Sequence, residues 1–128
     1  MERLLIILAA SFGFLGVALG AFGAHGLTRF LDGLEDGALQ LEWWKTAAHY
    51  HLVHSLAILG SALLIPRVSG AAPIVAGFLF VAGILIFSGS LYTMTLTGVR
   101  VLGAITPIGG LSFLAGWATL IVAAFRLN

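Results

Sequence analysis

The 128-residue chain has no cysteine, which excludes a disulfide framework, a thiolate metal site and a cysteine nucleophile. Charged residues are also scarce: they make up 9% of the chain, against about 25% of an average soluble protein. The six basic and five acidic residues form no basic stripe that would indicate a nucleic-acid partner. A P-loop, a GxSxG nucleophile elbow and an HExxH zinc motif are missing too.

Apolar residues dominate what is present. Hydrophobic residues account for 60% of the sequence, and the mean hydropathy is +1.11. A chain this short has too little interior to hide so much apolar surface from water. The composition therefore excludes a soluble globule and a disordered chain, and it indicates a protein that lives in lipid.

Four apolar runs are long enough to cross a bilayer, which takes about 20 residues. They cover residues 4–24, 46–65, 73–96 and 101–125. The first run also exceeds the roughly 7–15 apolar residues of a signal peptide. Because short connections make sequential helices antiparallel neighbours, the sequence predicts an all-α, up-down four-helix bundle that forms a single transmembrane domain over residues 1–128.

The longest connection joins the first two spans and carries an apolar stripe at helical spacing, formed by Leu27, Phe30, Leu31 and Leu34. This pattern predicts a short amphipathic helix at the membrane interface. A helical loop that packs on the ends of the bundle is the alternative. Trp43 and Trp44 indicate where the second span enters the membrane, with its helix starting near Ala38.

An even number of spans places both termini on one side of the membrane. Arg3, Arg67 and Arg126 lie on that side, and two further arginines and Lys45 lie on the other. The positive-inside rule, which counts Lys and Arg, is therefore tied. We expect a multi-pass membrane protein with cytoplasmic termini.

Glycines predict where helices approach closely, because apolar helices in lipid associate through small residues and close backbone contact. We expect the first span to be central and to touch two neighbours, and the third span offers Gly83 and Gly89. We also expect Pro107 to kink or unwind the fourth span, since proline lacks the backbone N–H. The candidate packing glycines of the first and fourth spans are Gly13, Gly16, Gly20, Gly23, Gly109, Gly110 and Gly116.

Polar residues inside the spans are expensive and usually face a bundle interior or a cavity. At 1.5 Å per residue, His54 and Ser88 lie roughly 12 Å below the membrane surface and Pro107 roughly 9 Å. Tyr50 and His54 share a helix face at spacing i, i+4. We therefore predict one polar pocket, lined by His25, Tyr50, His51, His54, Ser88, Ser90, Tyr92, Thr106 and Pro107.

Three uses of such a pocket remain open. Neutral histidines bind metal ions and haem iron readily, but no carboxylate lies inside a span to complete a site. A site for a proton or a small lipophilic ligand around His54 and Tyr50 is a second use. The third is a purely structural network of hydrogen bonds that fixes the register of the helices. We predict no metal site, no cofactor and no catalytic residue.

Several motifs occur in order along the chain: GAFGAH at 20–25, YHLVH at 50–54, FSGSLY at 87–92, TPIGG at 106–110 and FLAGW at 113–117. Together they resemble the YgdD/YwdK-type small membrane protein family, a domain-of-unknown-function group (family 423). The resemblance covers nearly the whole chain. It implies four transmembrane helices and a location in the membrane, for a bacterial protein the inner (plasma) membrane, and it implies no established activity. His49 and His51 depart from the family pattern, which argues against a site that needs all four histidines.

The functional prediction is a non-enzymatic integral membrane protein that acts as an accessory, assembly or structural component. Its expected partners are the lipid bilayer and a larger membrane complex or further copies of itself, with no nucleic acid. The first alternative is a binding or transport module for a small lipophilic ligand or a proton at His54. The second alternative is a haem or metal protein.

Overall fold

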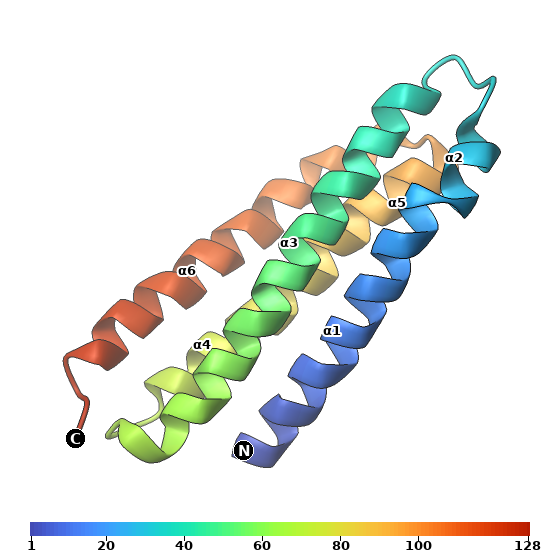
Figure 1. Ribbon diagram of the computed structural model, residues 1–128. Helices are drawn as coiled ribbons and strands as arrows, with labels where there is room; N and C mark the ends of the chain where they lie inside the picture. The colour runs from blue at the N-terminus through green and yellow to red at the C-terminus, as the bar shows by residue number, and fades with distance from the viewer.

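The computed structural model describes all residues, 1–128, and is helical without strands. Four helical spans cross the length of the molecule, as predicted, and a short helix joins the first two (Figure 1). Their elements are α1 (Glu2–Ala24), α2 (Gly26–Leu31), α3 (Gly37–Leu64) with η1 (Ile65–Arg67), α4 (Ala72–Gly83), η2 (Ile84–Ser88), α5 (Gly89–Thr97), η3 (Arg100–Ala104) and α6 (Thr106–Ala124).

Local sequence explains where the helices begin and end. Pro73 and Pro107 lie in the first turns of α4 and α6, where a missing N–H leaves no helical bond unmade. Gly98 follows α5 in the left-handed conformation, with φ of 71°, which glycine adopts without strain. No kink forms within α6, because Pro107 lies in its first turn, and the expected unwound stretch lies just before it, in the 3₁₀ segment η3 and Ile105.

The third span is continuous but irregular. It runs as α4, one turn of π-helix (η2) and α5, so the chain makes a wider turn in the middle of the membrane. Such turns are rare and often occur at functional sites. The side chain of Ser88, at the end of η2, donates to the backbone carbonyl of Ala47 at 2.8 Å and ties this turn to α3.

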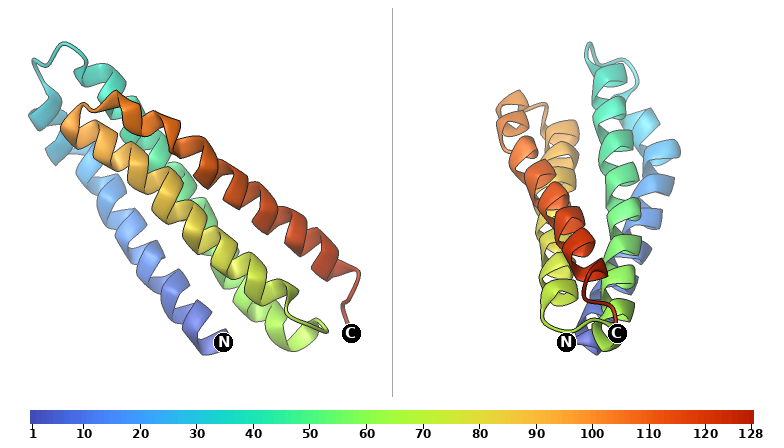
Figure 2. Two further views of the ribbon diagram at one scale, coloured as in Figure 1. Left: turned by 180° about the vertical axis from the view of Figure 1, so that it is seen from behind. Right: turned by 90° about the vertical axis from the view of Figure 1, so that its left-hand side faces the viewer.

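The bundle has two inner spans and two outer ones. In the most apolar stretch of each span, 44% of residues are buried for α3 and for the third span, but only 17% for α1 and for α6. Helix α1 packs mainly on α3, and α6 packs on α4 and η2. The right-hand view of Figure 2 shows the spans as two pairs, α1 beside α3 and α6 beside the third span. The first span is therefore peripheral, which corrects the expectation that it is central.

Most of the core lies where α3, α4 and α6 meet, and α1 adds two residues to it. Its largest fully buried side chain is Phe80 of α4. The buried members of this cluster are Leu5, Ala9, Ala57, Ile58, Ala62, Ala76, Phe80, Ile84 and Phe113.

Helix α2 ends before the last residue of the predicted apolar stripe, and only half of the stripe is buried. Leu27 and Leu31 are buried against Trp44 of α3, whereas Phe30 and Leu34 are 60% and 49% exposed. The helix therefore packs on the end of the bundle and also presents apolar side chains outward at the interface level.

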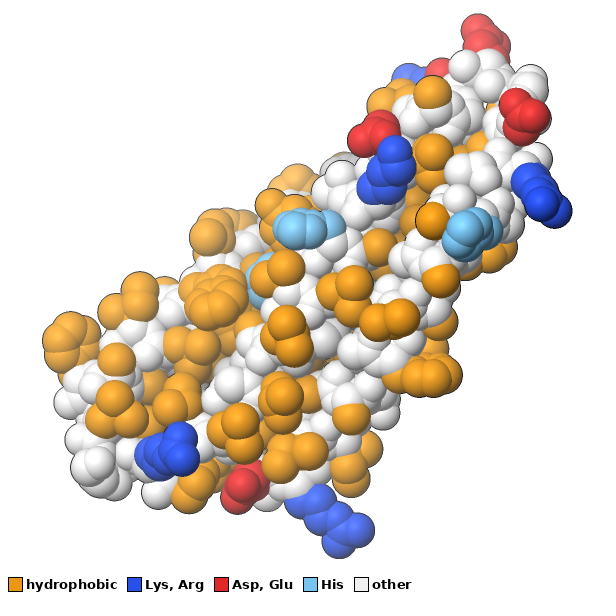
Figure 3. Space-filling model, viewed as in Figure 1, with side chains coloured by type: hydrophobic (Ala, Val, Ile, Leu, Met, Phe, Trp, Pro, Cys, Tyr) orange, Lys and Arg blue, Asp and Glu red, His pale blue; other side chains and the backbone are white.

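Surface chemistry agrees with a membrane-spanning rod. Apolar side chains cover the middle of the molecule, and most charged ones gather at its two ends (Figure 3). Both termini lie at the same end (Figure 1), as predicted. At the opposite end Arg100 pairs with Asp36 at 2.7 Å, and Lys45 pairs with Glu42 at 2.8 Å. A cytoplasmic location of the termini stays a prediction.

The packing glycines separate into two groups. A Cβ on Gly16 would lie 2.8 Å from Leu52, and one on Gly116 would lie 2.6 Å from Phe80. Both distances are too short for an ordinary contact, so these positions require glycine as the helices are placed. Gly13 and Gly20, in contrast, have no neighbouring atom within 4 Å of a Cβ and line hollows between α1 and α3. Gly77 packs against Leu5 in the same way and was not among the candidates.

Alanine at Gly23 should destabilise the protein by about 1–3 kcal/mol, the usual cost of overpacking. Its Cβ would lie 2.5 Å from the Trp44 indole, which is held in place because its Nε1–H donates to the Leu19 carbonyl at 2.8 Å. The matched change Gly20→Ala meets nothing and should be neutral or slightly stabilising. Thermal unfolding in detergent, followed by circular dichroism, compares the two. Equal midpoints for both variants would contradict the α1–α3 packing described here.

Candidate functional site

A groove runs between α3 and α6 on the surface that faces lipid. Its volume is about 620 Å³. Seven of its ten lining residues are hydrophobic, and they come from α3, η2 and α6. They are Tyr50, Val53, His54, Phe87, Pro107, Gly110, Leu111, Phe113, Leu114 and Trp117.

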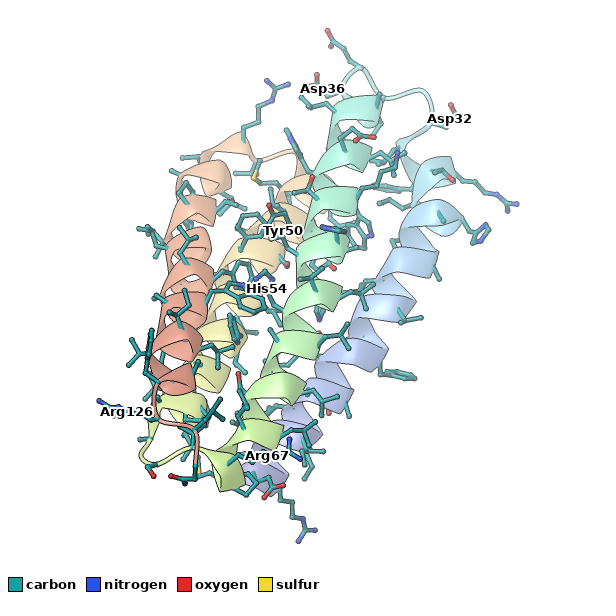
Figure 4. The ribbon with its side chains drawn as sticks, turned by 60° about the vertical axis from the view of Figure 1, so that its left-hand side comes forward. Asp32, Asp36, Tyr50, His54, Arg67 and Arg126 are labelled. Atoms are coloured by element: carbon teal, nitrogen blue, oxygen red, sulfur yellow. The ribbon has the colours of Figure 1, made fainter.

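Aromatic rings form the inner wall of this groove. The His54 ring stacks on Phe113 with centroids 3.5 Å apart and planes 9° apart. The Tyr50 ring continues nearly the same orientation, at 11° to His54 and 20° to Phe113. Figure 4 places Tyr50 and His54 one helical turn apart on α3, both between α3 and α6. The predicted i, i+4 pair therefore lies in one site.

Both ring nitrogens of His54 are already used. Nδ1 lies 2.7 Å from the Tyr50 backbone carbonyl, which can only accept, so this nitrogen carries the proton. Nε2 must then accept the Trp117 indole N–H, which lies 3.2 Å away. The imidazole is neutral in this arrangement and joins α3 to α6. No lone pair is left for a metal ion or for a proton in transit.

The other polar candidates form separate contacts rather than one pocket. His51 is buried on the flank of α3 that meets α1, against Phe12, and its Nδ1 lies 3.2 Å from the Tyr92 hydroxyl. Its Nε2 has no hydrogen-bond partner. Ser90 and Thr106 share a hydrogen bond of 2.6 Å between their hydroxyl groups. The structure thus replaces the single predicted pocket by a lipid-facing groove and several interhelical bonds.

The four histidines do not gather. His25 is exposed at the junction of α1 and α2, and His49 is exposed on α3. No three His, Asp or Glu side chains are placed to hold a metal ion. The geometry therefore offers no donor set for a metal ion that needs three such ligands.

Three aromatic residues of the groove were not among the sequence candidates: Phe87, Phe113 and Trp117. The aromatic pair on α6 lies at spacing i, i+4, the same spacing as Tyr50 and His54 on α3. Two such pairs on different spans are the signal that points to an aromatic contact between them. Phe87 carries no such signal, because its direction depends on the π-helical turn.

The fold and this groove define a class: a small polytopic membrane protein built as a four-span helical bundle with a lipid-open aromatic groove. Residues 19–110 match the family model described as "Protein of unknown function (DUF423)". The chain belongs to this family, as the resemblance of its motifs implied.

Relatives match along nearly their whole length. The chain is 43% identical to the UPF0382 membrane protein YwdK of Bacillus subtilis, over 97% of this chain and 98% of that protein. It is 42% identical to the UPF0382 inner membrane protein YgdD of Escherichia coli, over 99% and 93%. A UPF0382 membrane protein of Staphylococcus epidermidis is 43% identical over 97% of each. No solved structure matches the chain. The expected multi-pass membrane location is confirmed.

Proposed function

We propose that the protein is a non-enzymatic membrane component that holds a lipophilic molecule in the groove between α3 and α6. The observation that carries this proposal is the groove itself, which is open to lipid, about 620 Å³ in volume and walled by aromatic rings. Ligand sites are typically concave and mostly apolar, with a few polar groups that fix orientation. This groove has that composition and lies at the depth of the acyl chains.

Binding fits the available side chains better than catalysis does. A proton-transferring residue must be free to accept or release a proton, and both His54 nitrogens are hydrogen-bonded. The Ser90 and Thr106 hydroxyls bond to each other. No carboxylate lies within the groove. Only the Tyr50 hydroxyl is left as a polar group that can form a hydrogen bond with a bound molecule.

Photolabelling tests the proposal with a diazirine analogue of hexadecanol. In the purified protein the label should attach to α3 and α6 residues of the groove, and excess unlabelled hexadecanol should compete with it. Gly110→Leu should abolish most of this labelling, because the new side chain enters the groove, with no atom closer than 3.9 Å to its Cβ.

Gly60→Leu is the matched control. Gly60 is exposed on the same apolar surface, has no neighbour within 4 Å and does not line the groove. This variant should label as the wild type does. Uniform, non-competed labelling of all lipid-facing residues, or equal labelling of both leucine variants, would contradict the proposal.

An accessory role is a second candidate, and one observation favours it. Gly13 and Gly20 form a strip without side chains along the edge of the α1–α3 contact, and α1 is with α6 one of the two least buried spans. In lipid such a strip permits the close approach of another helix. If it serves a partner subunit, Gly20→Leu should release that subunit during gentle extraction and Gly60→Leu should not. Loss of the subunit from both variants, or from neither, would count against this role.

A further inference from the structure

The aromatic rings along the groove wall lie in nearly parallel planes. Tyr50, His54 and Phe113 lie within 20° of one plane orientation, and Tyr50 remains 40% exposed. Aromatic rings prefer offset parallel or edge-on contacts with other rings. A further planar ring that entered from the lipid would therefore extend a stack that already exists. A saturated acyl chain gains nothing from the parallel arrangement.

The Tyr50 hydroxyl supplies a single donor beside this surface. It bonds to no protein group, although the Tyr50 backbone carbonyl accepts from His54. Tyr50 lies six residues beyond Trp44 along α3, which corresponds to about 9 Å into the membrane from the tryptophan level. A hydroxyl without a partner in an apolar medium is costly. A ligand that carries a hydrogen-bond acceptor at this position removes that cost.

The groove also has room for a ring. Pro107 presents no N–H, and Gly110 presents no side chain. The α6 side of the groove is therefore apolar and has little side-chain bulk at this point. The nearest atoms to a Cβ on Gly110 belong to the Phe87 ring, at 3.9 and 4.0 Å. A planar group can therefore lie between α6 and the exposed face of Tyr50 without displacing the backbone.

We infer that the groove is specific for a planar lipophilic ring with a carbonyl oxygen, the chemistry of a quinone with an apolar tail. The ring stacks along Tyr50, the Tyr50 hydroxyl donates to the carbonyl, and the tail leaves through the side open to lipid. This inference rests on the proposed function, since it names the ligand class of the same groove. It assigns binding only, because His54, Ser90 and Thr106 are all held in hydrogen bonds within the protein.

Competition against the photoreactive hexadecanol label tests it. The competitors are decyl-1,4-benzoquinone, which has both ring and carbonyl, decylbenzene, which has the ring alone, and methyl undecanoate, which has an ester carbonyl without a ring. For the wild type, the quinone should displace the label at about tenfold lower concentration than decylbenzene, the upper range for one hydrogen bond. In Tyr50→Phe this difference should disappear, while decylbenzene competes as before.

The outcomes separate the two proposals. If quinone and decylbenzene compete equally in the wild type, the inference is wrong and the groove proposal stands. If methyl undecanoate matches the quinone, an ester-bearing lipid is the ligand and the ring assignment is wrong. If Tyr50→Phe keeps the quinone preference, the hydroxyl is not the donor and the inference falls. If the label itself is not competed by hexadecanol, the proposed function fails as well.

Discussion

Replacing Gly109 with alanine should prevent normal packing of the fourth span and leave little folded protein. A Cβ at this position would collide with the backbone nitrogen and Cα of Phe87 in the π-helical turn. A backbone contact cannot be relieved by a rotamer change, so α6 or η2 must shift as a whole. Overpacking typically costs about 1–3 kcal/mol and occasionally more, and here we expect the upper end.

The adjacent glycine provides the control for this change. A Cβ on Gly110 is 3.9 Å from its nearest neighbour, so Gly110→Ala removes a helix-destabilising residue without a clash. Size-exclusion yield and the thermal midpoint in detergent compare the two variants. Gly109→Ala should lose most of the monodisperse peak and Gly110→Ala should retain it. Indistinguishable behaviour would show that α6 does not rest on Phe87 as described.

Truncation of His54 to alanine should cost about 2–5 kcal/mol, the range for large-to-small changes in a packed core. The imidazole is 4% exposed, stacks on Phe113 and also contacts Phe80. Its loss opens a cavity between α3 and α6 and leaves the Trp117 N–H without an acceptor. Few other contacts hold α3 against α6, so the effect on this helix pair should be large.

Two further variants separate packing from hydrogen bonding. Trp117→Phe removes the bond to His54 and keeps a ring, so it should cost about 0.6 kcal/mol, the average for interhelical bonds in membranes. His49→Ala changes an exposed histidine on the same helix and should stay within about ±0.5 kcal/mol. Chemical unfolding in mixed micelles measures all three. If His54→Ala and His49→Ala lowered the free energy of unfolding by similar amounts, the result would contradict the buried position of His54 between α3 and α6.

The spans were predictable because the hydropathy and the length of each apolar run follow directly from the sequence. Rotation of each helix about its axis was not, since almost every face of these spans is apolar and lipid is as good a neighbour as another helix. This is why the second span could be located while Tyr50 and His51 were placed in one pocket. In the structure they face different sides of α3, toward α6 and toward α1.

The same reasoning explains the outcome for α1. Its four central glycines predicted contacts on more than one face, yet only Gly16 and Gly23 meet α3 closely, and Gly13 and Gly20 line hollows beside it. A glycine permits another helix to approach closely, but it does not require that a helix lie there. The direction of Phe87 was equally hidden, because a π-helical turn leaves no clear mark in the residues from 84 to 88.

Native mass spectrometry of the gently extracted protein tests the central claim, that the groove between α3 and α6 holds a lipophilic molecule. The wild type and Gly60→Leu should retain an adduct of one defined mass after the detergent is removed in the gas phase. Gly110→Leu should have lost it. A wild-type spectrum without an adduct, or the same adduct on Gly110→Leu, would contradict the account.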